Sequence, residues 1–172
     1  TAPEQVNAVV LLDPSGFPVE GKSLPLAFRL ARTPLVNQTL SLFTPRRLFQ
    51  TSLEEVYADD SLVTPALVDR YWELTLHAGN RQAFVDRANQ QEDQPTHLLR
   101  TIAAPVLVLW GAEDTWIPVE HAQKFSAMLP NATTLIYPDL GHVPMEEAPL
   151  RTAEDVRRFL QEYSNATDHA GH

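Results

Sequence analysis

The stretch VLVLWGAEDTWIP, residues 106–118, joins an uninterrupted apolar run to a loop that carries a carboxylate. An apolar run without polar alternation is typical of a parallel strand that helices cover on both faces. The segments VNAVVLL at 6–12 and TTLIY at 133–137 have nearly the same character. We therefore predict strands at 6–12, 106–109 and 133–137, placed in an internal parallel sheet.

A helix is predicted between the second and third strands, which makes a β-α-β unit. Pro118 is favoured at a first helical position, and apolar residues then recur at helical spacing. They are Val119, Ala122, Phe125 and Leu129. A closing helix is predicted from Thr152, which with Asp155 resembles a capping box, to Tyr163. Residues 164–172 are predicted to form a flexible polar tail.

The segment between the first two strands is far longer than a crossover helix needs, and it has no strand pattern. It contains several helix-start signals, in which a capping side chain precedes a proline or stands alone. These signals are Thr33-Pro34, Thr44-Pro45, Thr64-Pro65 and Asn80. We predict an all-helical insertion of four short helices over 24–95, with the sheet part formed by 1–23 and 96–163.

Composition excludes several classes of protein. The formal charge is −9, from 13 Lys and Arg against 22 Asp and Glu, and without a basic run we expect no nucleic-acid partner. The absence of cysteine rules out a disulfide, a thiolate metal site or a thiol nucleophile. No apolar run approaches the roughly 20 residues that cross a bilayer, and no secretory leader is recognisable. We expect a soluble, cytoplasmic protein that does not enter a membrane.

Loops that follow the second and third strands carry an acid and a base. Asp114 lies in the first loop, and His142 lies in the second, PDLGHVPMEEAP at 138–149. Neighbouring parallel strands lie about 4.8 Å apart, and ligands bind outside their carboxyl ends, so Asp114 and His142 should meet. A carboxylate beside an imidazole fixes its tautomer and stabilises the imidazolium. The pair is a general base that awaits a nucleophile.

The double motif W-G-x-x-D-x-x-x-P and G-H-x-P-x-x-E-x-P, after an apolar strand and a helical insertion, resembles the C-terminal half of an α/β-hydrolase superfamily enzyme. The resemblance covers nearly the whole chain. It implies an α/β class with a partial α/β-hydrolase fold: three parallel strands with flanking helices and an inserted all-helical cap. It also implies that Asp114 is the acid and His142 the general base of a nucleophile-His-Asp triad.

The nucleophile is not expected within this sequence. In the family it lies on a G-x-S-x-G elbow upstream of the strand that corresponds to 6–12, and this elbow and its oxyanion donors are absent. Ser15 follows a proline and has Asp13 two places before it, where an elbow needs a small residue. We therefore expect the isolated chain to be inactive.

Some site assignments stay open. Asp13, at the end of the first strand, is the alternative acid, because some members of the superfamily carry the acid there. Four residues near the loops are candidates for lining a hydrophobic substrate pocket: Trp116, Phe17, Val143 and Met145. The other five histidines are expected in solvated positions: His77, His97, His121, His169 and His172. No histidine spacing indicates a metal, and we expect neither a metal nor another cofactor.

The expected reaction is hydrolysis of an ester or a similar small, hydrophobic acyl compound. The same pair would serve a C–C bond hydrolase, an epoxide hydrolase or a haloalkane dehalogenase. A hypothesis from another class is a non-catalytic module that binds a hydrophobic ligand or a partner chain. Because strand 6–12 has only one partner strand here, we expect its open edge to pair with a missing N-terminal half or with a second copy of the chain.

Overall fold

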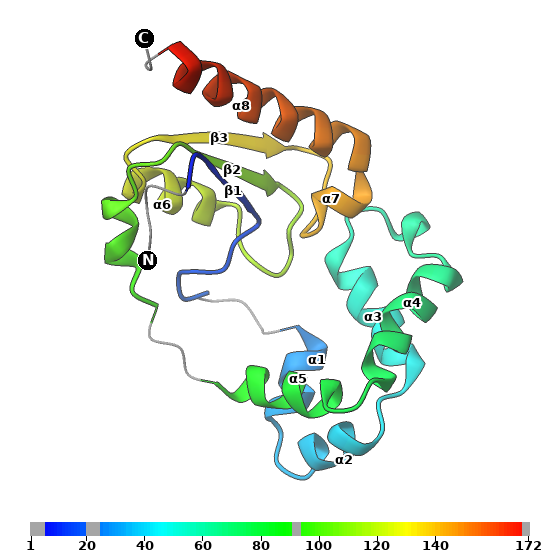
Figure 1. Ribbon diagram of the computed structural model, residues 1–172. Coiled ribbons are helices and arrows are strands. Elements are labelled where there is room, and N and C mark those ends of the chain that lie inside the picture. Colours follow the sequence, from blue (N-terminus) through cyan, green and yellow to red (C-terminus); the bar gives the residue numbers. More distant parts are fainter. Residues whose placement is uncertain (1–5, 20–24, 91–93, 170–172) are drawn as a thin grey trace. The chain divides into compact units, whose positions relative to one another are not determined.

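The computed structural model describes residues 6–19, 25–90 and 94–169, and the side chains of these ranges up to Tyr163. The chain divides into two compact units. Thr1–Pro18 and Gln94–His172 form one, which we call the sheet unit, and Val19–Asp93 form the other, which we call the helical unit. The sequence pattern predicted the helical insertion at 24–95. Each unit is described by itself (Figure 1).

The sheet unit contains three parallel strands in the order β1-β2-β3, as predicted. They are β1 (Val9–Leu12), β2 (Val106–Gly111) and β3 (Ala132–Tyr137). Every residue of β2 is buried, whereas β1 is half-buried throughout and β3 exposes three residues. The expectation of an internal sheet is therefore correct for β2 alone, because β1 and β3 each have one strand neighbour within the described residues.

Helices cover both faces of β2. Helix α6 (Glu120–Met128) lies on one face and α8 (Pro149–His169) on the other (Figure 1). Successive strand residues point to opposite faces, so the side chains of β2 contribute to two hydrophobic cores. The α6 core consists of Val106, Val108, Trp110, Ala122, Phe125 and Leu129. The α8 core consists of Leu107, Leu109, Tyr137, Leu140 and Phe159. The predicted β-α-β unit is confirmed as β2-α6-β3.

The closing helix differs from its prediction at both ends. It begins at Pro149, directly after the short helix α7 (Pro144–Glu147). Thr152 is not a cap, because it is buried inside the helix and its hydroxyl donates to the carbonyl oxygen of Pro144 at 2.9 Å. The helix continues to His169, since no glycine or proline follows Tyr163 within it, so the predicted tail at 164–172 is wrong as far as 169. Residues 170–172 lie outside the described residues.

Five α-helices form the described part of the helical unit, one more than predicted. They are α1 (Leu26–Arg32), α2 (Val36–Leu42), α3 (Arg46–Val56), α4 (Pro65–Leu76) and α5 (Asn80–Asn89), with a 3-10 turn, η2, at Asp60–Leu62. Their shared core consists of Ala31, Leu40, Val85 and Ala88. Helix α1 is the one without a predicted start signal, because no side chain caps its first turn.

Among the four predicted cap signals, only Thr64 acts as predicted. Its hydroxyl accepts from the N–H of Leu67, and Pro65 follows as the first helical residue. Thr44 instead donates to the carbonyl oxygen of Leu40, and Asn80 lies inside the helix that it was predicted to cap. A hydroxyl at a predicted cap position does not cap the helix when it hydrogen-bonds to a nearby backbone carbonyl oxygen instead.

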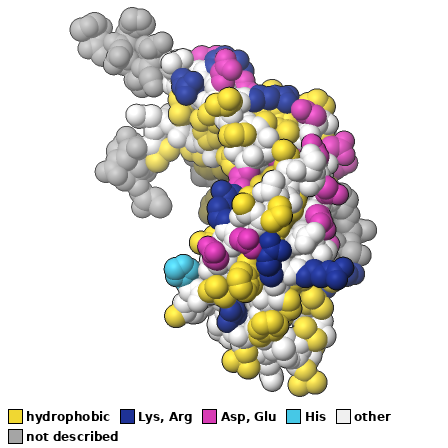
Figure 2. Space-filling view, turned by 90° about the vertical axis from the view of Figure 1, so that its right-hand side faces the viewer, with side chains coloured by type: hydrophobic (Ala, Val, Ile, Leu, Met, Phe, Trp, Pro, Cys, Tyr) yellow, Lys and Arg dark blue, Asp and Glu magenta, His cyan; other side chains and the backbone are white. Residues whose placement is uncertain are grey.

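Large apolar side chains stay exposed around α2, namely Leu35, Leu42 and Phe43. Figure 2 shows apolar side chains interspersed with charged ones on one face of the molecule. Scattered exposed apolar residues are ordinary on a protein surface and identify no partner by themselves. None of the described helices is both long enough and apolar enough to span a lipid bilayer.

Candidate functional site

The loops after β2 and β3 bring an acid and an imidazole together. Nδ1 of His142 lies 2.7 Å from Oδ2 of Asp114. The Asp114 side chain is fully buried, and the His142 side chain is 20% exposed. The predicted proximity of the two residues is therefore confirmed, since the carboxyl ends of adjacent parallel strands deliver both loops to one edge.

Asp114 accepts hydrogen bonds on both carboxylate oxygens. Its Oδ1 accepts from the backbone N–H of Trp116 at 2.8 Å and of Ile117 at 2.9 Å. With Oδ2 as an acceptor as well, Nδ1 of His142 must be the donor of the 2.7 Å bond. The neutral imidazole therefore has its lone pair on Nε2, which is the form that a general base requires.

Gly111 allows the two loops to touch. A Cβ atom at this position would lie 2.0 Å from the carbonyl oxygen of Gly141 and 2.4 Å from that of Leu140. Both atoms belong to the backbone, so neither can rotate away as a side chain could. The glycine of the W-G motif is therefore required by the close approach of the loop that carries His142.

Other residues of the double motif stabilise this arrangement. The backbone N–H of Glu113 donates to the carbonyl oxygen of Leu140 at 3.0 Å, which ties the loops directly. Oε1 of Glu147, the glutamate of the second motif, accepts from the N–H of Gly141 at 2.8 Å. A side chain of α7 therefore fixes the backbone of Gly141, the residue before His142. The glycine and the glutamate of the second motif thus have a structural role in positioning the histidine.

Asp13 directly follows β1, beside this pair, and is 3% exposed. Its Oδ1 accepts from the backbone N–H of Gly111 at 2.9 Å. Burial above all, with the charges of Asp114 and Glu147, raises the pKa of Asp13 to about 8, although the hydrogen bond from the Gly111 N–H acts in the opposite direction. The alternative acid therefore bonds to the backbone of β2, whereas Nδ1 of His142 bonds to Asp114.

The same three side chains are the group that comes nearest to a metal-ligand set among the described residues. Asp13, Asp114 and His142 each offer one oxygen or nitrogen atom, and these atoms lie within 4.8 Å of one another. Both oxygens of Asp114 already accept N–H bonds, one of them from His142. This bonding pattern favours proton transfer over metal coordination. The expectation of no metal and no cofactor stays a prediction.

The four predicted pocket residues fall in different surroundings. The Trp116 ring centroid lies 5.3 Å from that of His142, so this residue forms a wall of the site. Val143 follows His142 and is half-buried, and Met145 is 38% exposed on α7. The Phe17 ring instead packs edge-on against Phe125, with 4.9 Å between centroids, in the α6 core. Substrate contact by any of them stays a prediction.

The expectation of a solvated His121 is wrong. This residue is 2% exposed, and its ring packs edge-on against those of Phe17 and Trp110. Burial lowers its pKa, and the charge of Lys124 acts in the same direction. A helical count would have found it, because it precedes Phe125 by four residues on the apolar stripe of α6. His77 and His97 are exposed as expected, and the side chains of His169 and His172 lie outside the described ones.

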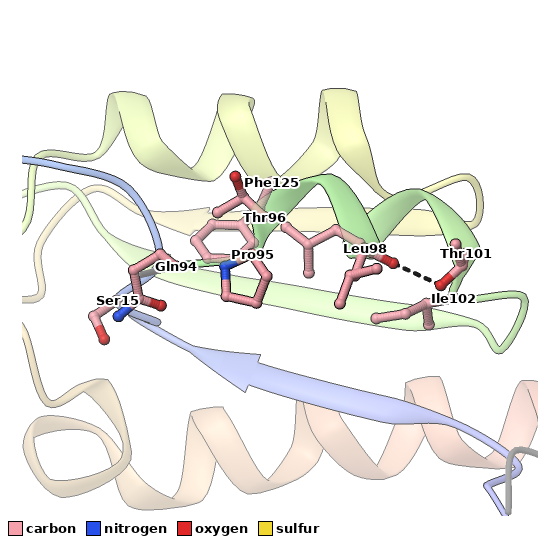
Figure 3. Close-up of a pocket in the computed structure, with 10 residues that line it drawn as sticks. Ser15, Gln94, Pro95, Thr96, Leu98, Thr101, Ile102 and Phe125 are labelled. Carbon is pink, nitrogen blue, oxygen red and sulfur yellow. Dashed lines mark hydrogen bonds between the residues drawn. The ribbon is translucent and has the colours of Figure 1, made fainter. Parts of the chain in front are cut away.

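A cavity of about 330 Å³ lies among residues of the sheet unit (Figure 3). It is bounded by Ser15 and Gly16 after β1, by the 3-10 helix η3 (Thr96–Thr101) and by Phe125 of α6. Neither Asp114 nor His142 lines it. The lining is mostly apolar, and no motif in the sequence predicted this hollow.

Comparisons with known proteins place the chain in a family. A family model described as "Alpha/beta hydrolase family" matches residues 2–155. Lipase 3 of Moraxella sp. is 27% identical over 167 residues, which cover 91% of this chain and 49% of the lipase. The 2-hydroxy-6-oxo-6-phenylhexa-2,4-dienoate hydrolase of Burkholderia cepacia is 26% identical over 150 residues, with 81% and 49% covered.

A solved structure of a membrane phospholipase A, described as a bacterial virulence factor, is 27% identical. It has a TM-score of 0.72, with 95% of this chain and 52% of that chain covered. The chain spans about half the length of the curated relatives it matches.

We expect Gly111→Ala to disrupt the site and the sheet unit together. The new methyl group would collide with two backbone oxygens, which should cost at least about 3 kcal/mol of unfolding free energy. Gly79→Ala is the matched control, because its φ is +86° but a Cβ there meets nothing within 4 Å, so about 1 kcal/mol is expected. Urea unfolding measures both, and equal losses in the two variants would contradict the role given to Gly111.

Proposed function

The chain belongs to the alpha/beta hydrolase family, and on this premise we propose that it supplies the acid and the base of a nucleophile-His-Asp triad. His142 is the general base and Asp114 the acid. The observation that carries the proposal is the 2.7 Å hydrogen bond between Nδ1 of His142 and Oδ2 of Asp114, made where the carboxyl ends of β2 and β3 meet.

Each residue has a separate task in the proposed reaction. Nε2 of His142 takes the proton of a nucleophile as it attacks the substrate carbon, and later returns a proton to the leaving group or draws one from water. Asp114 holds the imidazole in this tautomer and stabilises the imidazolium. The nucleophile and the oxyanion donors come from sequence beyond these 172 residues, in line with the chain's coverage of about half of its relatives.

The proposed substrate is an ester or a similar small hydrophobic acyl compound. A lipase among the relatives supports this class, and the Trp116 ring beside His142 offers an apolar wall to such a group. Cleavage of a C–C bond is the second candidate, because another relative at similar identity is a dienoate hydrolase. Epoxide hydrolysis and dehalogenation would instead require an aspartate as the nucleophile, a position that this proposal places beyond these 172 residues.

The helical unit is proposed to act as the cap that selects the substrate. Its own core and its five helices support an independently packed insertion between β1 and β2. A cytoplasmic location is part of the proposal as well. The rival hypothesis is that the chain is a non-catalytic module. The hydrogen bond between Asp114 and His142 favours the enzyme over this hypothesis.

The proposed partner is the N-terminal half of a longer hydrolase, with a second copy of the chain as the alternative. Among the described residues β1 pairs with β2 alone, so its other edge can accept a strand. Parallel crossovers are right-handed, so a strand added before β1 places its connecting helix on the face that α6 covers. The 330 Å³ cavity lies beside α6, where such a helix would pack.

We expect the isolated chain to show no saturable hydrolysis of p-nitrophenyl acetate. Loss of the nucleophile removes a factor on the order of 10⁶ in a hydrolase of this kind. The rate of the pure chain should rise linearly with substrate, and His142→Ala should change it only as much as loss of one partly exposed histidine does. Saturable turnover that disappears in His142→Ala would show that the chain holds a complete site.

In a longer form that carries the nucleophile, Asp114→Asn should lower kcat by about 10⁴, because the asparagine favours the wrong imidazole tautomer. Asp13→Asn should have a much smaller effect, since Asp13 bonds to Gly111 and not to His142. Steady-state kinetics of the two variants provide the comparison. The reverse order of effects would move the acid to β1 and contradict the assignment.

We also expect the pure chain to associate. An apolar strand edge without proline or lysine is a template for pairing with another chain. Sedimentation over a concentration series should therefore reveal dimers or larger species, and addition of a complementary N-terminal half should convert them to a 1:1 complex. A stable monomer at high micromolar concentration that binds no hydrophobic dye would refute this prediction.

A further inference from the structure

Asp13 is a buried carboxyl group whose bonding is incomplete. Its Oδ1 accepts from the N–H of Gly111, and its buried Oδ2 has no hydrogen-bond partner within the described part of the chain. An atom of this carboxyl group lies within 4.8 Å of ligand atoms of Asp114 and His142. A buried polar atom without a hydrogen-bond partner costs free energy, so the position of this atom beside Asp114 and His142 needs an explanation.

The backbone of Asp13 supports a specific role. Its φ is +41°, in the left-handed region that residues other than glycine seldom adopt. Such strained positions persist where the surroundings impose them, and they are concentrated at functional sites. Here the conformation directs the carboxyl group at the end of β1 to the backbone of Gly111, the residue that lets the Asp114 and His142 loops meet.

The number of donors decides which carboxyl group carries a proton. Asp114 accepts from three N–H groups, those of Trp116, Ile117 and His142. Asp13 accepts from one. Two buried carboxylates this close together repel each other, and the group with fewer donors is the one that takes up a proton.

We propose that Asp13 is a positioning residue of this site, present as the neutral carboxylic acid, in which Oδ1 anchors Gly111 and Oδ2 carries the proton beside the Asp114–His142 pair. The inference rests on the proposed function, because it takes His142 as the general base and Asp114 as the acid that orients it. It differs from the role of alternative acid, because an acid of the triad would accept from Nδ1 of His142 as a carboxylate.

A neutral Asp13 keeps His142 useful as a base. The charged groups that face Asp13 are Asp114 and His142 on the two loops and Glu147 on α7. If Asp13 ionised, a second negative charge would stabilise the imidazolium and hold the proton on His142 at neutral pH. The pKa of Asp13, raised to about 8 by burial and by its acidic neighbours, fits a group that is neutral at pH 7.

The test is an NMR titration of the 172-residue chain from pH 4 to 10. The ¹³Cγ signal of Asp13 should report an inflection near pH 8, and the side-chain ¹⁵N signals of His142 should show a second, smaller inflection at the same pH. Asp13→Asn keeps an acceptor for Gly111 and supplies an N–H in place of the hydroxyl, so it should abolish the inflection near pH 8 and leave the main His142 step unchanged. Asp139→Asn, which alters an exposed carboxylate paired with Arg151, is the matched control and should change neither.

A second measurement uses stability. The folded-state pKa of Asp13 is above its ordinary value of 3.8, so the folded chain binds one more proton than the unfolded chain between about pH 4 and pH 8. Its contribution is fully present below pH 4 and is lost as the pH rises through 8. The melting temperature of the unaltered chain should therefore fall relative to that of Asp13→Asn as the pH rises from about 4 to about 8.

An Asp13 ¹³Cγ inflection near pH 4 would overturn the proposal, as would a large downward shift of the main His142 step in Asp13→Asn, because both require an ionised Asp13 at neutral pH. If the variant does not fold, the ¹³Cγ titration of the unaltered chain decides by itself. Failure of the proposed function is distinguishable, because a broken His142–Asp114 bond would remove the downfield Nδ1 proton resonance whatever the state of Asp13.

Discussion

The close approach of two backbone segments at Gly111 is the constraint on which the site depends. The carbonyl oxygens of Leu140 and Gly141 occupy the space that any side chain at this position would fill. The loop of His142 therefore lies directly against the end of β2, and the 2.7 Å bond to Asp114 follows from that contact. A glycine is needed here for the space that it leaves open.

Around this contact the backbone supplies most of the donors. The N–H groups of Trp116 and Ile117 hold Asp114, that of Gly111 holds Asp13, and that of Gly141 is held by Glu147. Backbone donors of adjacent strand ends are rigid, so they orient the carboxyl groups without the entropy cost of ordering long side chains. Unequal numbers of donors at neighbouring carboxyl groups also separate their protonation states, which gives a charged acid and a neutral one at the same sheet edge.

The distribution of burial supports the proposal that a further strand pairs with β1. Central strand β2 is covered on both faces by α6 and α8 (Figure 1), whereas β1 has an apolar sequence but is only half-buried. The cavity between the loop after β1, η3 and α6 lies on the α6 face of the same strand. An apolar strand with an open edge and a hollow beside it is the pattern expected where further strands and helices pack.

Much of the architecture follows from local sequence. Uninterrupted apolar runs marked β1 and β2, a nearly apolar run marked β3, and Thr64-Pro65 marked the start of α4, because strand patterning and helix capping depend on neighbouring residues in the chain. The loop positions of Asp114 and His142 were predictable for a similar reason, since the ends of adjacent parallel strands meet at one edge. Tertiary structure alone decided which of two aspartates bonds to the imidazole, because Asp13 and Asp114 both follow strands of the same sheet. It also packed Phe17 against the α6 core, since side-chain packing between elements cannot be derived from the spacing of that residue, whereas the helical spacing of His121 to Phe125 already indicated its burial.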